Sequence, residues 1–216
     1  MTIKVAILDF DGTLVESNDI KDSAFEALYS ELPQWAEIRD YHLANNHTIR
    51  FEKFRAIDED ILDVPHTAER ARDLAVRFQD LVVQAIASAP WVTGATELLD
   101  ALDAAGVHAY LLSMSPAEEL ARILEMRGVG GRFAAVYAHP WSKGEAVCDI
   151  LARENASPSE AVMIGDSPED ASVAGECGVR FVGRDSGKPF ASDVEAYPDL
   201  LGVISTLDLD AEASDG

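Results

Sequence analysis

The chain has 216 residues, which is long enough for one well-packed domain or for a core domain that carries a smaller inserted one. Hydrophobic residues make up 48% of it. No apolar run approaches the roughly 18 residues that cross a bilayer, and no secretory cleavage signal precedes the first strand-like segment, so we expect a cytoplasmic protein. With 17 basic and 39 acidic residues the formal charge is -22, which opposes nonspecific binding to nucleic acid or to anionic membranes.

The first predicted element is a buried parallel strand at residues 4–9, where a short apolar run ends at the turn-forming pair Asp11-Gly12. Residues 16–90 then show helical periodicity and no convincing strand, so we predict an inserted helical domain. Within it, the apolar residues of segment 67–87 keep i, i+3, i+4 spacing, which indicates a helix with one buried face. Pro90 and Gly94 mark the return to the main domain.

From residue 91 onward, strand-like and helix-like segments alternate. Further strands are predicted at residues 107–113, 133–137, 161–165 and 179–182, and helices at 95–105, 116–127, 143–154 and 169–177. This alternation is typical of a parallel sheet with right-handed crossovers. The predicted fold class is therefore α/β, with a doubly wound, Rossmann-like core at residues 1–15 and 91–216 and an α-helical insertion at residues 16–90.

The first strand ends in the sequence Asp9-Phe10-Asp11-Gly12-Thr13-Leu14, which holds two carboxylates one residue apart. In open α/β sheets, ligands bind at the carboxyl ends of the strands. An extended chain would turn the two side chains apart, but a turn at Gly12 allows Asp11 to curl back toward Asp9. One carboxylate can then act as a nucleophile while the other transfers protons.

This segment resembles the first motif, DxDG[TV], of the haloacid dehalogenase superfamily, and three further motifs of that family follow in order. Ser113, in Leu-Leu-Ser-Met-Ser-Pro, matches the Ser or Thr that hydrogen-bonds the phosphoryl oxygens, and Lys143 matches the lysine that neutralises the nucleophile and the phosphate. Gly165-Asp166-Ser167-Pro168-Glu169-Asp170 matches GDxxxD, the acidic motif that holds magnesium. The resemblance implies that Gly12 and Met114 also contact the phosphate.

A cation is required on electrostatic grounds as well, because a phosphate dianion repels the attacking carboxylate. Magnesium prefers an octahedron of oxygen ligands. The expected protein ligands are the carboxylates of Asp9 and Asp166 and the backbone carbonyl of Asp11, while Asp170 orients a water or contacts the ion. The predicted cofactor is therefore Mg²⁺.

Asp11 also discriminates within the superfamily, because the family pattern of true dehalogenases lacks an acid two residues after the nucleophile. An alkoxide leaving group needs a proton, whereas halide does not. We therefore expect hydrolysis of a small phosphomonoester, with a small phosphorylated metabolite as partner. Two alternatives stay open: a phosphotransferase of the mutase type, which would use the same four motifs, and a noncatalytic binding protein that has kept the fold.

The superfamily resemblance implies that the insertion is a C1 cap, a helical lid that selects the substrate. Segment 47–54 is similar to phosphoglycolate-phosphatase-like members. Arg50 and Lys53, one helical turn apart, would present two positive charges to an anionic substrate tail, unless they simply pair with neighbouring acids or face solvent. Asn18 and Lys21, which follow the first motif, are weaker candidates for substrate contact. No oligomeric state is predicted.

The sequence contains two cysteines, Cys148 and Cys177. They are too few for a disulfide framework and lack the spacing of a metal site. We expect both to be buried as small apolar side chains.

Overall fold

The computed structural model describes residues 2–45, 48–207 and 209, so His47 of segment 47–54 lies outside the described residues. By their internal contacts these residues form two compact units. The core unit comprises Met1–Ser17 and Ala87–Gly216, and the helical unit comprises Asn18–Ile86.

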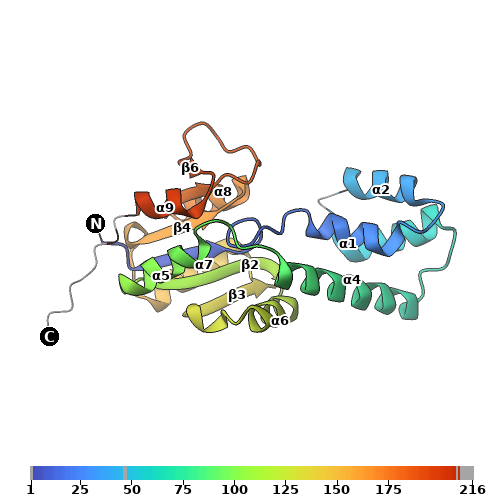
Figure 1. The fold of residues 1–216 in the computed structure, drawn as a ribbon, viewed down its shortest axis with the longest axis horizontal. Coiled ribbons are helices and arrows are strands. Elements are labelled where there is room, and N and C mark those ends of the chain that lie inside the picture. Colours follow the sequence, from blue (N-terminus) through green and yellow to red (C-terminus); the bar gives the residue numbers. More distant parts are fainter. Residues whose placement is uncertain (1, 46–47, 208, 210–216) are drawn as a thin grey trace. The chain divides into compact units, whose positions relative to one another are not determined.

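Six strands form one parallel sheet in the core unit, in the order β3-β2-β1-β4-β5-β6 (Figure 1). Their bounds are β1 (Val5–Asp9), β2 (His108–Pro116), β3 (Ala135–His139), β4 (Ala161–Gly165), β5 (Arg180–Arg184) and β6 (Ala196–Tyr197). β1 lies between β2 and β4, and the chain order reverses there, so the carboxyl end of β1 is the switch point where ligands bind in such sheets. The predicted doubly wound parallel sheet is confirmed.

Helices cover both faces of this sheet. They are α5 (Ala95–Ala104), α6 (Ala117–Arg127), α7 (Lys143–Arg153), α8 (Pro168–Glu176) and α9 (Leu200–Thr206), with short 3-10 turns at Gly130–Arg132 and Pro158–Glu160. α5 packs against α9, and α7 packs against α8. On the α7 and α8 side, Val5 and Ile7 of β1 join a buried cluster with Val147 and Ile150 of α7. Because strand side chains alternate, Ala6 and Leu8 face the other side, and all of β1 is buried.

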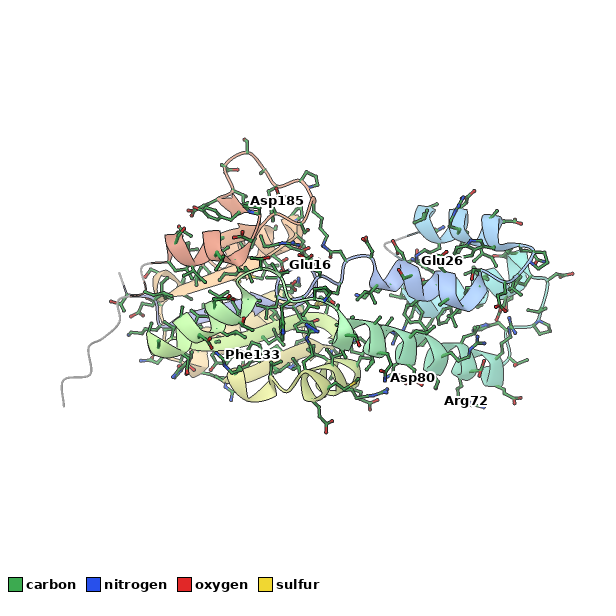
Figure 2. The ribbon with its side chains drawn as sticks, viewed as in Figure 1. Glu16, Glu26, Arg72, Asp80, Phe133 and Asp185 are labelled. Atoms are coloured by element: carbon green, nitrogen blue, oxygen red, sulfur yellow. The ribbon has the colours of Figure 1, made fainter. Side chains whose placement is uncertain are left out.

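The helical unit consists of α1 (Ile20–Tyr29), α2 (Trp35–Ala44), α3 (Arg50–Ala56), a π-helical turn (Ile57–Ile61) and most of α4 (Ala68–Ser88). The predicted apolar stripe of α4 is buried at Leu74, Phe78, Val82, Val83 and Ile86. Phe78 meets Phe25 and Phe54 at ring-centroid distances of 5.1 and 5.7 Å. Arg72 and Asp80, on the opposite side of α4, are exposed (Figure 2). Burial of this aromatic cluster explains why the segment folds as a bundle.

The chain leaves and re-enters the core unit through two segments that lie side by side. The Glu16 amide donates to the Pro90 carbonyl at 3.0 Å, and the Val92 amide donates to the Leu14 carbonyl at 2.9 Å. The Arg127 guanidinium donates to the Ala89 carbonyl at 2.9 Å and lies 4.0 Å from the Trp91 ring centroid. These contacts fix both crossing segments to the body of the core unit.

Two features differ from the sequence predictions. Cys148 is exposed and Cys177 is half-buried, so the prediction that both are core residues was wrong; α7 turns Val147 and Ile150 toward the sheet, which leaves Cys148 outward. The two-residue strand β6 was also not predicted, because it is too short to show any periodicity. Among the described residues, no helix is both long and apolar enough to span a membrane.

Candidate active site

Asp9 is the last residue of β1 and its side chain is buried, with 6% relative exposure. The chain then turns sharply: the Leu14 amide donates to the Phe10 carbonyl at 3.0 Å, and Gly12 has φ of 75°. That backbone conformation is one that side-chain-bearing residues adopt at a cost, which explains the glycine. The Thr13 hydroxyl donates to Asp9 Oδ2 at 3.1 Å and so orients the carboxylate.

Asp11 is held by two serine hydroxyls. Ser17 Oγ donates to Asp11 Oδ1 at 2.7 Å, and Ser115 Oγ donates to Oδ2 at 3.1 Å. These bonds hold the Asp11 carboxylate in one orientation at the same sheet edge as Asp9. Ser115, which lies 104 positions further along the chain, had not been singled out in the sequence.

Ser113 lies near the end of β2 and is 99% buried, with 1% relative exposure. Pairing between β2 and β3 changes register between Leu112 and Pro116, so the segment that contains Ser113 departs from regular sheet geometry. The Ser115 amide donates to Ser113 Oγ at 3.1 Å. The side chain of Met114 is exposed, so any contact of this residue with a phosphate would come from its backbone.

Lys143 is the first residue of α7, and Ser142 caps this helix through a reciprocal bond pair with Glu145. Its Nζ lies 3.2 Å from Asp9 Oδ1 and 2.5 Å from Asp170 Oδ1. All three side chains are buried. The helix start therefore delivers an ammonium group directly to the carboxylate at the end of β1.

Asp166 and Asp170 follow β4, at the start of α8. Asp170 Oδ2 accepts bonds from the Ser167 hydroxyl at 2.6 Å and from the Ser167 amide at 3.2 Å, which closes the cap of α8. A Cβ atom on Gly165 would lie 2.6 Å from Asp170 Cγ. Gly165 is thus required for Asp170 to lie against the strand end.

The carboxylates of Asp9, Asp166 and Asp170 offer oxygens that all lie within 4.8 Å of one another. Three buried carboxylates at this spacing suit a hard divalent cation with oxygen ligands, so the residues present fit Mg²⁺. The Asp11 carboxylate is engaged by Ser17 and Ser115, which is consistent with the expectation that this residue would offer its backbone carbonyl to a metal.

Electrostatics in this cluster favour an additional cation. Burial raises the pKa of Asp9 to about 7, although Lys143 opposes the shift, and Asp170, Asp11 and Asp166 add to it. Burial alone would lower the pKa of Lys143, but Asp9 and Asp170 outweigh it and raise the pKa above its usual value. The neighbouring carboxylates therefore carry more negative charge than Lys143 balances.

Two basic residues, one at the end of β5 and one in the connection that follows it, also reach this site and were missed in the sequence. Arg184 donates to the Gly12 carbonyl at 3.0 Å and to Glu16 Oε1 at 2.5 Å; Glu16 and Asp185, the residue after Arg184, are labelled in Figure 2. Lys188 Nζ lies 2.7 Å from Asp166 Oδ2. A usable signal was present, because residues that follow a predicted parallel strand lie at the same sheet edge as Asp9.

A model of the haloacid dehalogenase-like hydrolase family matches residues 3–178. The chain belongs to this family. The match includes the segments that carry Asp9, Ser113, Lys143 and Asp166. No curated protein matches the sequence significantly.

Solved structures of haloacid dehalogenase-like proteins share the fold. A predicted phosphoglycolate phosphatase from Haemophilus somnus 129pt is 18% identical, with a TM-score of 0.71, over 95% of this chain and 98% of that chain. A putative β-phosphoglucomutase from Thermotoga maritima is 18% identical, with a TM-score of 0.68, over 84% and 85%. A putative hydrolase from Bacillus subtilis, bound to magnesium, is 14% identical, with a TM-score of 0.72, over 96% and 100%. At these identities the similarity establishes a common fold.

The predicted substrate residues of this haloacid dehalogenase-like chain lie in the helical unit. Asn18 and Lys21 are exposed, and the Arg50 guanidinium lies 5.2 and 5.4 Å from the rings of Phe51 and Phe78. Lys53 does not share an exposed face with Arg50, because its side chain is buried.

The surroundings of Lys53 explain its burial. Its Nζ lies 3.3 Å from Nδ1 of His42, whose ring stacks on Phe25 at a centroid distance of 4.0 Å. His42 Nε2 in turn lies 2.9 Å from Asp22 Oδ1. Burial lowers the pKa of Lys53 and that of His42, while Asp22 opposes both shifts. A substrate contact by Lys53 stays a prediction.

Proposed function

We propose that this protein hydrolyses a small phosphomonoester in a magnesium-dependent reaction that proceeds through an aspartyl-phosphate on Asp9. The observation that carries the proposal is the buried carboxylate of Asp9 with Lys143 Nζ at 3.2 Å, beside a second carboxylate, Asp11, held by two hydroxyls. A buried nucleophile beside a fixed ammonium group and a separate acid is the set that phosphoryl transfer to a carboxylate needs.

In the first half-reaction, an Asp9 oxygen attacks phosphorus and the bond from phosphorus to the ester oxygen breaks. The departing alkoxide takes a proton from the carboxylic acid form of Asp11, so an alcohol leaves. Lys143 balances part of the charge on the phosphoryl oxygens, and Ser113 donates a hydrogen bond to one of them. Asp9 then carries the phosphoryl group as an acyl phosphate.

In the second half-reaction, the ionised Asp11 takes a proton from a water molecule, and the resulting hydroxide attacks phosphorus. The bond from phosphorus to the Asp9 oxygen breaks, which releases phosphate and regenerates both carboxyl groups in their starting forms. The bonds from Ser17 and Ser115 keep Asp11 in one orientation for both proton transfers. Fixed positioning of this kind supplies much of the rate enhancement in phosphoryl transfer.

Asp9, Asp166 and Asp170, with the backbone carbonyl of Asp11, would hold the magnesium ion. When bound, the ion supplies positive charge that lowers the repulsion between the phosphate dianion and the nucleophile. Three acidic side chains within 4.8 Å of one another support this assignment. A divalent cation would also lower the pKa of Asp9 from about 7 and so favour the ionised nucleophile.

The helical unit would act as the cap that selects the substrate, with Arg50, Asn18 and Lys21 as candidate contacts for its nonreacting part. The similar structures include proteins described as a predicted phosphoglycolate phosphatase and a putative β-phosphoglucomutase, which supports a small phosphorylated metabolite as the substrate class. The expected compartment is the cytoplasm.

The test is release of inorganic phosphate from an aryl phosphate and from a panel of phosphorylated metabolites. We expect turnover with magnesium and none after EDTA treatment. In Asp166→Ala the magnesium concentration for half-maximal activity should rise, because the site loses a charged ligand. Turnover that persists in EDTA, or an unchanged magnesium requirement in this variant, would refute the proposal.

A phosphotransferase of the mutase type is the alternative, and the similarity to a putative β-phosphoglucomutase favours considering it. Such an enzyme would pass the phosphoryl group from Asp9 to a sugar hydroxyl instead of water. Incubation with a sugar monophosphate and a small amount of the sugar bisphosphate separates the two: a mutase converts the monophosphate into its positional isomer without net release of phosphate, whereas a hydrolase accumulates phosphate. A noncatalytic binding protein would release no phosphate from any ester.

A further inference from the structure

Lys188 approaches the candidate metal cluster from the connection between β5 and β6. Its Nζ lies 2.7 Å from Asp166 Oδ2. The Asp166 side chain is 3% exposed, whereas that of Lys188 is 42% exposed. The ammonium group therefore reaches inward to a buried carboxylate while its stem stays accessible to solvent.

The connection that carries Lys188 is anchored at the site. Arg184, at its start, is buried and donates to the Gly12 carbonyl at 3.0 Å. The Gly187 amide donates to Asp185 Oδ1 at 2.9 Å, which closes a turn just before Lys188, and Ser186 Oγ lies 3.5 Å from the Asp166 carbonyl. The backbone at Lys188 is therefore held in place, and this position directs its side chain to Asp166.

The contact between Lys188 and Asp166 changes the charge balance of the carboxylate cluster. Lys143 lies between Asp9 and Asp170, at 3.2 and 2.5 Å, and Lys188 supplies a cation to Asp166, the third carboxylate of the group. A magnesium ion bound by Asp166 would meet a positive charge already placed on the same carboxylate. Two cations beside one carboxylate repel each other, and this repulsion is strong where the surroundings are buried.

We propose that Lys188 competes with magnesium for Asp166: it stabilises the metal-free enzyme and lowers the affinity of the site for the ion. This inference rests on the proposed function, since it assumes that magnesium binds at Asp9, Asp166 and Asp170. Because the Lys188 side chain is partly exposed, it can swing into solvent when the metal enters, without unfolding of the connection. Lys188 is a positioning residue in this scheme and makes no bond to the reacting phosphoryl group.

The experiment compares wild type with Lys188→Met, Lys188→Arg and Lys4→Met. Lys4 is the matched control, because it also forms a 2.7 Å ion pair, with Glu160, but an exposed one at the other end of β1. Magnesium affinity is measured by calorimetric titration, and melting temperature is measured in EDTA and in saturating magnesium. Neither readout requires turnover.

We expect Lys188→Met to bind magnesium about three- to tenfold more tightly than wild type, as removal of a partly exposed competing ion pair allows. Its melting temperature should lie below that of wild type in EDTA, and saturating magnesium should reduce or reverse the difference. Lys188→Arg keeps the charge and should stay within about twofold of wild-type affinity. Lys4→Met should leave both the affinity and the magnesium-dependent change in melting temperature unchanged.

If Lys188→Met binds magnesium no more tightly than wild type, the inference is overturned. The proposed function still stands in that case, provided that the wild-type protein binds magnesium. A raised KM for the phosphate ester with unchanged magnesium affinity also overturns it, because Lys188 would then act on the substrate. Absence of magnesium binding in the wild type overturns both this inference and the proposed function.

Discussion

The core unit and the helical unit both bury ionisable side chains, but they balance the charge differently. In the core unit, Asp9, Asp166 and Asp170 lie within 4.8 Å of one another around one buried lysine, Lys143. In the helical unit, the fully buried Asp58 lies 2.7 Å from His66 Nδ1 and 2.8 Å from Arg70.

We interpret this difference as one between a cluster that binds a ligand and a cluster that stabilises the fold. The charge of Asp58 is balanced by basic side chains of the same unit, so no ligand is needed to compensate it. Its ion pair with Arg70 holds the π-helical turn against α4. The three carboxylates of the core unit face two lysines, the buried Lys143 and the half-exposed Lys188, so one formal negative charge is left in excess and favours a further cation. Buried charge costs several kcal/mol unless it is compensated, so an excess that folding leaves uncompensated points to a ligand.

The largest expected effect is on the core cluster. Asp9→Asn keeps the shape of the side chain but removes the nucleophile, so kcat should fall by about four orders of magnitude or more. Phosphate release measures kcat, and circular dichroism checks that the fold is kept. Asp100→Asn, which alters an exposed ion pair with Arg132, is the control and should keep full activity. Activity within about tenfold of wild type in Asp9→Asn would exclude Asp9 as the nucleophile.

Asp11→Asn should distinguish the proton donor from the nucleophile. Hydrolysis of an alkyl phosphate should fall by about two to four orders of magnitude, because its leaving group needs a proton. An aryl phosphate leaves with little protonation, so a first turnover should survive as a burst of aryl alcohol, followed by slow release of phosphate. Rapid-quench measurements on both esters test this. If the first turnover is lost equally for the two, the acid role of Asp11 is wrong.

A change in the helical unit should affect stability instead of metal binding. Asp58→Asn removes the buried charge that pairs with the half-exposed Arg70 and should lower the free energy of unfolding by about 1.5 to 3 kcal/mol, as the loss of a charged hydrogen bond does. Urea unfolding measures this change, and calorimetric titration should give the wild-type magnesium affinity. A changed magnesium affinity with unchanged stability would reverse the roles that we assign to the two clusters.

Within the helical unit, substitutions of Arg50 and Lys53 should have different effects on activity. Arg50→Ala should lower kcat/KM for the best metabolite by about ten- to a hundredfold and for a small aryl phosphate much less, because only the metabolite has a tail to bind. Lys53 is buried against His42, so Lys53→Met should lower kcat/KM for both esters equally, through its effect on the unit's stability. Selective loss on the metabolite in Lys53→Met would instead assign it to substrate binding.

A further expected effect concerns pH. Burial raises the pKa of Asp9 from 3.8 to about 7 in the metal-free protein, so between these values the native state binds more protons than the unfolded state. Stability in EDTA should therefore fall as pH rises from about 4 to 7. Asp9→Asn lacks this group and should show a flatter dependence in urea unfolding across the same range. Identical slopes in the two proteins would contradict the shift.

The strand-end residues of the core could be predicted because sheet topology brings them together. Asp9 ends β1, Asp166 follows β4 and Ser113 lies near the end of β2, and the carboxyl ends of parallel strands meet at one edge of the sheet. Lys143 could be predicted because it opens a predicted helix and matches the lysine of the family motif. The geometry that unites these residues is a property of the backbone, which hydrophobic periodicity reports well.

The contacts that could not be predicted depend on side-chain reach and on packing. Lys188 and Ser115 arrive from irregular segments, where no periodicity indicates direction. Arg50 and Lys53 have the spacing of one helical face, but the spacing does not say which face is buried; contacts with His42 and Phe25 turn Lys53 inward. The same reason explains the exposed Cys148, since packing of α7 decides its orientation.

The carboxylate of Asp170 takes part in both the charged site and the cap of α8, because one oxygen accepts a hydrogen bond from Lys143 and the other accepts from Ser167. The first turn of α8 and the charged site therefore depend on the same carboxylate. The backbone amide of Ser167, which donates to the same carboxylate, should exchange its hydrogen with solvent at a rate set by occupancy of the site. The hydrogen-exchange rate of this amide should therefore report ligand binding at the site, without a measurement of turnover.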